Sequence, residues 1–195
     1  LYERLIESID KNRIFHDPLY TLAYGTDASF YRLIPKLVIR ANNENEISFI
    51  LKECSELSIP ITFRAAGTSL SGQAISDSVL VIAGNHWKNF NISENGSEIR
   101  LQPGLTGGRA NELLAPYGRK IGPDPASINA AMIGGIAANN ASGMCCGTAE
   151  NSYKTVAGMR IILADGTILD TRDQLSKNNF RESHSKLLSD IEILA

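Results

Sequence analysis

A chain of 195 residues can bury the core of one domain or of two small ones, and its 43% hydrophobic residues are ordinary for a globular protein. The formal net charge of −2 argues against a nucleic-acid partner. No apolar run is long enough to span a membrane, and the first residues are amphipathic, unlike a signal peptide. We therefore expect a cytoplasmic chain. The absence of an initiating Met suggests that it starts inside a longer protein.

The cysteines and histidines form no familiar metal or disulfide pattern. Cys54, Cys145 and Cys146 are odd in number, and two of them are adjacent. The three histidines lie far apart in the sequence. We expect free thiols in a reducing compartment and no metal site.

The first third of the chain has the pattern strand, helix, strand. A short helix is predicted over residues 2–9 and a strand over 36–40. From Asn43, apolar residues recur every three or four positions, which indicates an amphipathic helix that ends before Pro60. Ile59–Phe63 is then a buried strand. Such β-α-β units commonly bind ligands where the second strand ends.

The segment after that strand is rich in small and hydroxylated residues: Arg64-Ala65-Ala66-Gly67-Thr68-Ser69-Leu70-Ser71-Gly72-Gln73-Ala74. Few side chains would keep an anion from its backbone N–H groups, so it has the chemistry of a phosphate-binding loop. It matches neither G-x-x-x-x-G-K-[ST] nor G-x-G-x-x-G at the start of a helix. Taken alone, it fits a tight turn beside a strand equally well.

The rest of the chain alternates short strands and helices. A packing role is expected for Trp87, in preference to stacking on a ligand. Hairpin turns are expected at residues 94–97 and 164–167. The predicted strands are 79–83, 90–92, 98–102, 159–163 and 168–170, and the predicted helices are 106–115 and 185–195.

Residues 129–143 hold almost nothing larger than Asn apart from Met132 and the isoleucines. Such a stretch is a poor core, because small side chains bury little apolar area. It permits either tight packing of a helix on a strand or a groove for a large ligand. Adjacent Asn139 and Asn140 favour the groove, because buried amides need hydrogen-bond partners.

Four segments occur in a recognisable order: Arg64–Ala74, Pro123–Ser127, Ile133–Gly135 with Asn140–Gly143, and Val156–Gly166. Together they resemble the FAD-binding domain of the vanillyl-alcohol oxidase and para-cresol methylhydroxylase flavoproteins, and within that group the D-lactate, glycolate and D-2-hydroxyglutarate dehydrogenases. The likeness spans roughly residues 27–171. The resemblance implies an α+β fold in which two α/β subdomains clasp an extended FAD. It divides the chain into a lead-in (1–26), a first FAD subdomain with the diphosphate loop (27–75) and a second subdomain (76–195).

The resemblance also assigns cofactor-binding residues. Those expected at the diphosphate are Ala65, Ala66, Gly67, Thr68, Ser69 and Leu70, with Gly72 and Gln73 completing the loop. Those expected along the ribityl chain and isoalloxazine ring are Pro123, Ser127, Met132, Gly134, Gly135, Asn139, Ser142 and Gly143. Some relatives attach FAD through a His in the first loop or through a Cys. Here Thr68 and Ala130 stand at those positions, so non-covalent FAD is expected, and Cys145 and Cys146 have no assigned purpose.

The reaction that the resemblance implies is oxidation of a D-2-hydroxy acid by hydride transfer to flavin N5. Electrons would then pass to an acceptor such as a quinone, a cytochrome or an iron–sulfur module. The chain ends before the family's final FAD segment and its cap domain, so we expect no catalytic residue here and an inactive chain on its own. Two alternatives are another enzyme class on the same scaffold, resembling the alkyl-ether lipid synthases, and a non-catalytic nucleotide-binding module.

Overall fold

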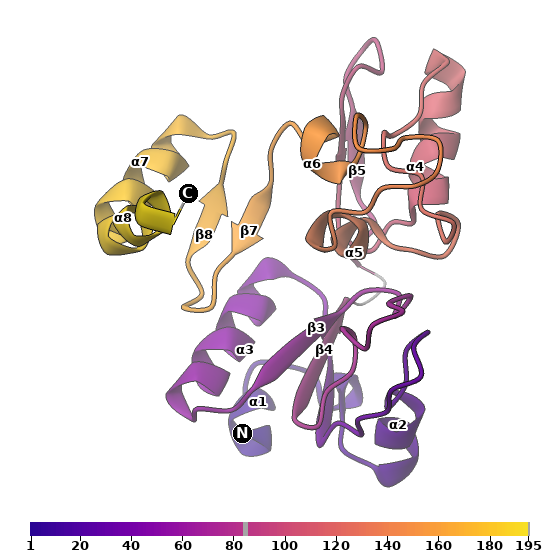
Figure 1. The fold of residues 1–195 in the computed structure, drawn as a ribbon. Helices are drawn as coiled ribbons and strands as arrows, with labels where there is room; N and C mark the ends of the chain where they lie inside the picture. The colour runs from indigo at the N-terminus through magenta and orange to yellow at the C-terminus, as the bar shows by residue number, and fades with distance from the viewer. Residues whose placement is uncertain (84–85, 195) are drawn as a thin grey trace.

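A four-stranded sheet forms the first unit of the protein (Figure 1). The computed structural model describes residues 1–83 and 86–194. The strand order is β1-β2-β4-β3, with β2 and β3 both parallel to β4 and β1 antiparallel to β2. The strands are β1 (Ile14–Phe15), β2 (Leu37–Ala41), β3 (Ile61–Arg64) and β4 (Val79–Ala83). The helices of this unit are α1 (Tyr2–Leu5), η1 (Lys11–Arg13), α2 (Pro18–Ala23) and α3 (Glu44–Glu56).

Helix α3 supplies the crossover between the parallel strands β2 and β3. Asn43 begins it by accepting a hydrogen bond from the backbone N–H of Glu46. Its buried residues Ile50 and Cys54 join a core that includes Ile39 and Val81 of the sheet. The other face of the sheet buries Val38, Leu80 and Ile82. Burial on both faces explains why β2 and β4 are nearly continuous apolar runs.

The second unit lies above the carboxyl ends of the parallel strands in Figure 1. A hairpin of β5 (Phe90–Ile92) and β6 (Ile99–Leu101) is followed by α4 (Gly107–Leu114), η2 (Ala115–Tyr117), α5 (Ile133–Ala138) and α6 (Ser152–Thr155). A second hairpin of β7 (Arg160–Ile162) and β8 (Ile168–Asp170) comes next, and then α7 (Gln174–Ser183) and α8 (Ser185–Leu194).

Hydrogen bonds and an ion pair among the described residues join the two units. The indole N–H of Trp87 donates to the carbonyl oxygen of Ala41 at 2.7 Å, and the Trp87 side chain is buried. The hydroxyl of Ser48 donates to the carbonyl of Gly166 in the β7–β8 turn, and Arg160 pairs with Glu44 at the start of α3. The packing role expected for Trp87 is therefore confirmed.

The structure differs from the predicted elements at several places. The helix expected over residues 2–9 ends at Leu5, and β1, α2, α5, α6 and α7 were not predicted as regular elements. The expected subdomain boundary after residue 75 falls before β4, which pairs with both β2 and β3 at the centre of the first sheet. We therefore propose that the first subdomain extends to Ala83 and that residues before 27 belong to it, because Leu5, Ile9 and Ile14 are part of its core.

Replacing Leu80 with Ala tests this account of the core. Leu80 is fully buried in β4, so Leu80→Ala is expected to lower the free energy of unfolding by about 2–5 kcal/mol. Leu175→Ala is the matched control, because Leu175 lies on α7 with 67% of its surface exposed, and a change of only about 0.5 kcal/mol is expected. Urea unfolding measures both; equal losses would contradict the assignment of the core.

Candidate functional site

The small-residue loop begins where β3 ends, at the carboxyl edge of the parallel strands. Its far end is folded by Ser69, whose hydroxyl accepts hydrogen bonds from the backbone N–H groups of Ser71 and Gln73, both at 3.2 Å. Its middle is tied to the lead-in, because the N–H of Ala28 donates to the carbonyl of Gly67 at 3.1 Å. These bonds fix the shape of the loop without using the backbone N–H groups of residues 65–70.

Those six backbone N–H groups are the principal feature of the site. Within the part of the chain that the structure describes, none of the hydrogen bonds has a backbone N–H of residues 65–70 as its donor. The side chains are small apart from Leu70, which is 77% exposed. Backbone N–H groups need acceptors, and a run of them without protein partners is suited to an anion with several oxygens.

Two charged residues brace this loop from below. Arg64 donates to the carbonyl oxygen of Thr26 at 2.7 Å. Asp27 accepts from the N–H of Ser29 at 2.8 Å and from that of Ala74 at 3.3 Å. Burial acts to raise the pKa of Asp27, but these hydrogen bonds and the charge of Arg64 outweigh it and lower that pKa. Neither residue was among the predicted cofactor-binding residues, although both flank segments that the sequence singles out.

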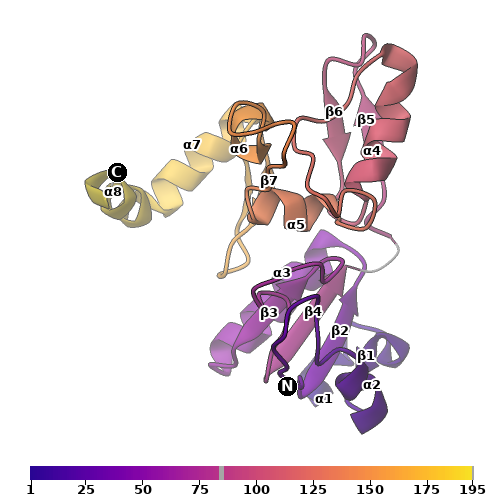
Figure 2. The same cartoon turned by 45° about the vertical axis from the view of Figure 1, so that its right-hand side comes forward.

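The second wall of the site is helix α5, which lies directly above the carboxyl edge of the first sheet in Figures 1 and 2. A Cβ atom added to Gly135 would lie 3.7 Å from the Cβ of Ala65. The structure thus brings the start of the loop and the helix together, although 70 residues separate them in the sequence. Gly134 has a different environment: a Cβ there would meet Pro103 at 2.7 Å, so it packs within the second unit.

Asp124 organises the remaining predicted segments. Its carboxylate accepts hydrogen bonds from the backbone N–H groups of Cys146 and Cys145, both at 3.1 Å. Hydrogen bonding from Cys146, and then from Cys145, lowers the pKa of Asp124 to about 2. A side chain on Gly143 would collide with Asp124. The turn at residues 122–127 and the loop at 143–147 are therefore fastened to each other.

The other predicted residues lie along the same path of the chain. Pro123 is buried, Ser127 and Met132 are half-buried, and Met132 is held by a β-bridge to Thr106. Asn139 and Asn140 were expected to be buried amides, and that part of the expectation is wrong, because both are exposed. The groove that they were expected to line stays a prediction. The side-chain carbonyl of Asn140 instead accepts from the N–H of Tyr153. Ser142 is also exposed.

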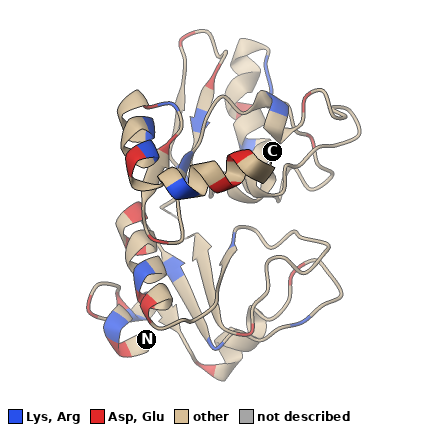
Figure 3. Ribbon diagram, turned by 60° about the vertical axis from the view of Figure 1, so that its left-hand side comes forward, with Lys and Arg blue, Asp and Glu red and all other residues tan. Residues whose placement is uncertain are grey.

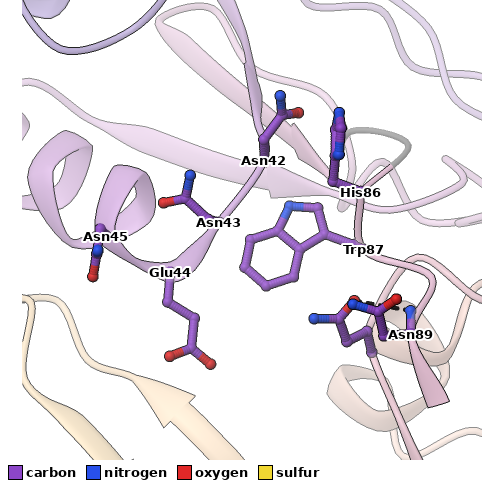
Figure 4. Close-up of a pocket in the computed structure, with 8 residues that line it drawn as sticks. Asn42, Asn43, Glu44, Asn45, His86, Trp87 and Asn89 are labelled. Atoms are coloured by element: carbon purple, nitrogen blue, oxygen red, sulfur yellow. Dashed lines mark hydrogen bonds between the residues drawn. The ribbon is translucent and has the colours of Figure 1, made fainter.

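A hollow of about 480 Å³ lies elsewhere, at the start of α3 (Figure 4). None of the predicted cofactor-binding residues lines it. Three of its polar residues already have structural partners: Asn43 begins α3, Glu44 pairs with Arg160, and the Gln102 side chain accepts from the N–H of Asn89. It is a gap at the junction of the two units. Its lining residues are Asn42, Asn43, Glu44, Asn45, His86, Trp87, Asn89 and Gln102.

In residues 1–83 and 86–194 there is no group of three or more His, Cys, Asp or Glu side chains that could hold a metal ion. In the same residues, every helix is too short or too polar to cross a bilayer. Acidic and basic residues are interspersed over the helices in Figure 3.

A family model described as an FAD-binding domain matches residues 35–172, which is most of the chain. The match includes the loop after β3, helix α5 and the β7–β8 hairpin. The protein therefore belongs to this family of FAD-binding domains, and FAD is its cofactor. The α+β fold and the resemblance inferred from the four segments are confirmed.

Curated relatives narrow the family further. Glycolate oxidase subunit GlcD of Escherichia coli K12 is 33% identical over 145 residues, which cover 73% of this chain and 29% of GlcD. D-2-hydroxyglutarate dehydrogenase of Pantoea ananatis is 28% identical over 77% of this chain and 15% of that protein. Mitochondrial D-lactate dehydrogenase [cytochrome] 1 of Saccharomyces cerevisiae is 29% identical over 74% and 25%. The chain thus spans less than a third of each of these relatives.

A solved structure shows the same fold. Alkyldihydroxyacetonephosphate synthase aligns with a TM-score of 0.74 over 88% of this chain and 34% of that protein, at 16% sequence identity. At that identity, the likeness shows the architecture alone.

The residues present fit the diphosphate of FAD. Six backbone N–H groups in a row, which have no acceptor in residues 1–83 and 86–194, can donate to its oxygens, and Gly135 leaves the opposite wall without a side chain. Thr68 and Ser69 add hydroxyl groups at the same turn. The identities of the individual FAD contacts remain predictions.

Acid titration tests the role of Asp124. Because its folded-state pKa is lowered, the ionised carboxylate stabilises the fold above its ordinary pKa of 3.8, and this contribution is lost as the pH falls towards about 2. We expect its carboxyl NMR signal to titrate near pH 2, and the amide hydrogens of Cys145 and Cys146 to exchange faster below that pH. In Asp124→Asn, which has one acceptor oxygen, one of these amides should exchange rapidly at every pH. A carboxyl midpoint near 4 would contradict the two hydrogen bonds.

Proposed function

We propose that this chain is the FAD-holding part of a flavin-dependent dehydrogenase that oxidises a D-2-hydroxy acid of the D-lactate, glycolate or D-2-hydroxyglutarate class. The observation that carries the proposal is the row of backbone N–H groups in residues 65–70 that have no acceptor among the described residues, in a chain that matches hydroxy-acid oxidoreductases. The first residue of this row, Ala65, lies opposite Gly135. The class of substrate follows from the names of the curated relatives, each of which includes much more protein than this chain.

Each segment of the site has a distinct proposed role. The loop after β3 binds the diphosphate through its backbone, and the hydroxyl of Thr68 donates beside it. The hydroxyl of Ser69 donates to the Gln73 side chain at 3.1 Å and so helps to fold the loop. Gly135 lets the cofactor pass close to the backbone of α5. Pro123, Ser127 and Met132 line the flavin end. Gly134 and Gly143 act by close packing, against Pro103 and Asp124 respectively.

FAD, when bound, supplies the two-electron chemistry by taking a hydride from the α-carbon of the hydroxy acid. The hydroxyl proton must go to a base as the 2-oxo acid forms, and we assign no such base to the residues of this chain.

FAD is held non-covalently, since Thr68 offers no imidazole for attachment. The electron acceptor is a quinone, a cytochrome or an iron–sulfur module. A reducing compartment such as the cytoplasm suits the three free thiols.

The alternative of an alkyl-ether lipid synthase is not favoured. Its support is a structural likeness at 16% identity, whereas the hydroxy-acid enzymes match at 28–33% over about three quarters of the chain. A non-catalytic module would bind a nucleotide without redox chemistry. The substrate experiment below distinguishes these possibilities.

Replacing Gly67 with Ala tests the FAD site. Gly67 has a φ of +73°, and its added Cβ would lie 2.6 Å from Cζ of Arg64, so Gly67→Ala must displace the guanidinium and reshape the loop. We expect its affinity for FAD to fall about tenfold or more, measured by equilibrium dialysis of the flavin-free protein. Gly118→Ala is the matched control, because Gly118 has a φ of +64° with no atom within 4 Å of its added Cβ.

The parent and Gly118→Ala are expected to show the absorbance bands of oxidised flavin after dialysis. Thermal melts establish that Gly67→Ala is folded. If folded Gly67→Ala held FAD as tightly as the parent, the loop after β3 would not be the diphosphate site.

Substrate class is tested with protein expressed from its complete coding sequence and loaded with FAD. Without oxygen, D-lactate, glycolate or D-2-hydroxyglutarate is expected to bleach the oxidised-flavin absorbance, whereas L-lactate leaves it unchanged. Bleaching by dithionite serves as the positive control. A protein that binds FAD but is bleached by none of the three acids would disprove the proposed reaction while leaving the FAD site intact.

A further inference from the structure

Arg64 links the two ends of the diphosphate loop. It is the last residue of β3, and its side chain turns towards the loop. The Nη1 group donates to the carbonyl oxygen of Thr26 at 2.7 Å, and to those of Tyr24 and Ala74 at 3.4 Å each. Ala74 closes the loop, and the other two residues belong to the lead-in segment. One guanidinium therefore sets the distance between the loop and the segment that supports it.

The same guanidinium lies against the centre of the loop. A Cβ atom on Gly67 would be 2.6 Å from Cζ and 2.7 Å from Nε of Arg64, so only the glycine hydrogen separates the cation from the loop backbone. The Arg64 group also lies 5.8 Å from the centre of the Tyr24 ring. The positive charge is thus held beside the backbone N–H groups that have no protein acceptor.

This charge is only partly balanced by acidic groups. Within the described part of the chain, no carboxylate oxygen lies within the 4.0 Å of an ion pair with Arg64. Asp27 is near enough to interact with it electrostatically, but its oxygens accept from Ser29 and Ala74. Burial lowers the pKa of Arg64, and the charge of Asp27 opposes that shift. An arginine remains charged at neutral pH despite such a shift.

Residues 65–74 contain no Lys or Arg, so the loop has no cation of its own. A diphosphate bound to its N–H groups would bring two negative charges into a half-buried site. We propose that Arg64 is the positioning residue of this site: it shapes the loop through three carbonyl groups and supplies the counter-charge for the diphosphate of a dinucleotide. This inference rests on the proposed FAD-binding function.

Arginine suits both roles better than lysine. Its Nη1 contacts the three carbonyl oxygens while Cζ and Nε remain beside Gly67. An ammonium group is compact and cannot do both at once. The inference therefore distinguishes loss of charge from loss of shape: Arg64→Met removes the charge at similar length, and Arg64→Lys keeps the charge but loses the fork.

The experiment measures binding of FAD, ADP and riboflavin to the flavin-free chain by isothermal titration calorimetry, at low and high NaCl. Arg64→Met is expected to bind FAD and ADP about tenfold more weakly than the parent and to lose most of the salt dependence. Its affinity for riboflavin, which has no phosphate, should stay within about twofold. Arg64→Lys should lie between the two and retain the salt dependence. Arg4→Met is the matched control for charge, because Arg4 pairs with Glu53 and Glu56 on α3, and it should bind like the parent.

The possible outcomes separate this inference from the proposed function. If folded Arg64→Met bound ADP within twofold of the parent, Arg64 would have no such role, although the FAD site would stand. If circular dichroism shows that Arg64→Met does not fold, the test is made on the parent protein. An affinity for ADP that stays constant as NaCl is raised from about 50 to about 500 mM would contradict the proposed counter-charge role of Arg64. A parent that binds riboflavin but not ADP also overturns it. A parent that binds none of the three ligands overturns both the inference and the FAD-binding function.

Discussion

Backbone N–H groups need hydrogen-bond acceptors, and the loop after β3 leaves six consecutive ones without any in the described protein. Regular structure could not leave such a row free, because a strand or helix would pair most of them. The fold keeps the loop irregular by other means: Ser69 folds its far end, Ala28 holds its centre, and Arg64 and Asp27 fasten its base. The rest of the first unit provides a rigid edge on which this loop stands.

The second unit provides the opposite side of the candidate site, facing the loop after β3. Its position depends on contacts between the units: the Trp87 indole on Ala41, Ser48 on the β7–β8 turn, and Arg160 on Glu44. These bonds lie on the α3 side of the junction, whereas Ala65 and Gly135 meet where the loop faces α5. The described contacts thus join the two units on the α3 side, while on the other side two small residues, Ala65 and Gly135, approach each other.

Much of this arrangement follows from the sequence, because its local signals are strong. Between residues 36 and 64, the spacing of the apolar residues changes from that of a strand to that of a helix and back, which predicts the β-α-β unit. The Asp-Gly turn predicts the β7–β8 hairpin. Helix α2 has a readable signal as well, since Asp17 caps it and Pro18 occupies its first turn. The exposed positions of Asn139 and Asn140 have no such signal. Both residues lie beyond the end of α5, so the apolar face formed by Ile133 and Ile136 does not determine where they point.

The site depends on contacts between residues that are far apart in the sequence, and local sequence patterns cannot predict such contacts. The bonds from Arg64 to Thr26 and from Ala74 to Asp27 span 38 and 47 residues. From the local sequence alone, Gly67 can be identified only as a turn residue. In the structure, its lack of a side chain both permits the positive φ and leaves room for the Arg64 guanidinium. The same holds for Gly143, whose lack of a side chain is explained by Asp124, 19 residues earlier. The small residues that suggest a cofactor groove therefore divide into two groups: Gly135 faces the loop across the site, whereas Gly134 and Gly143 are small because the protein itself packs against them.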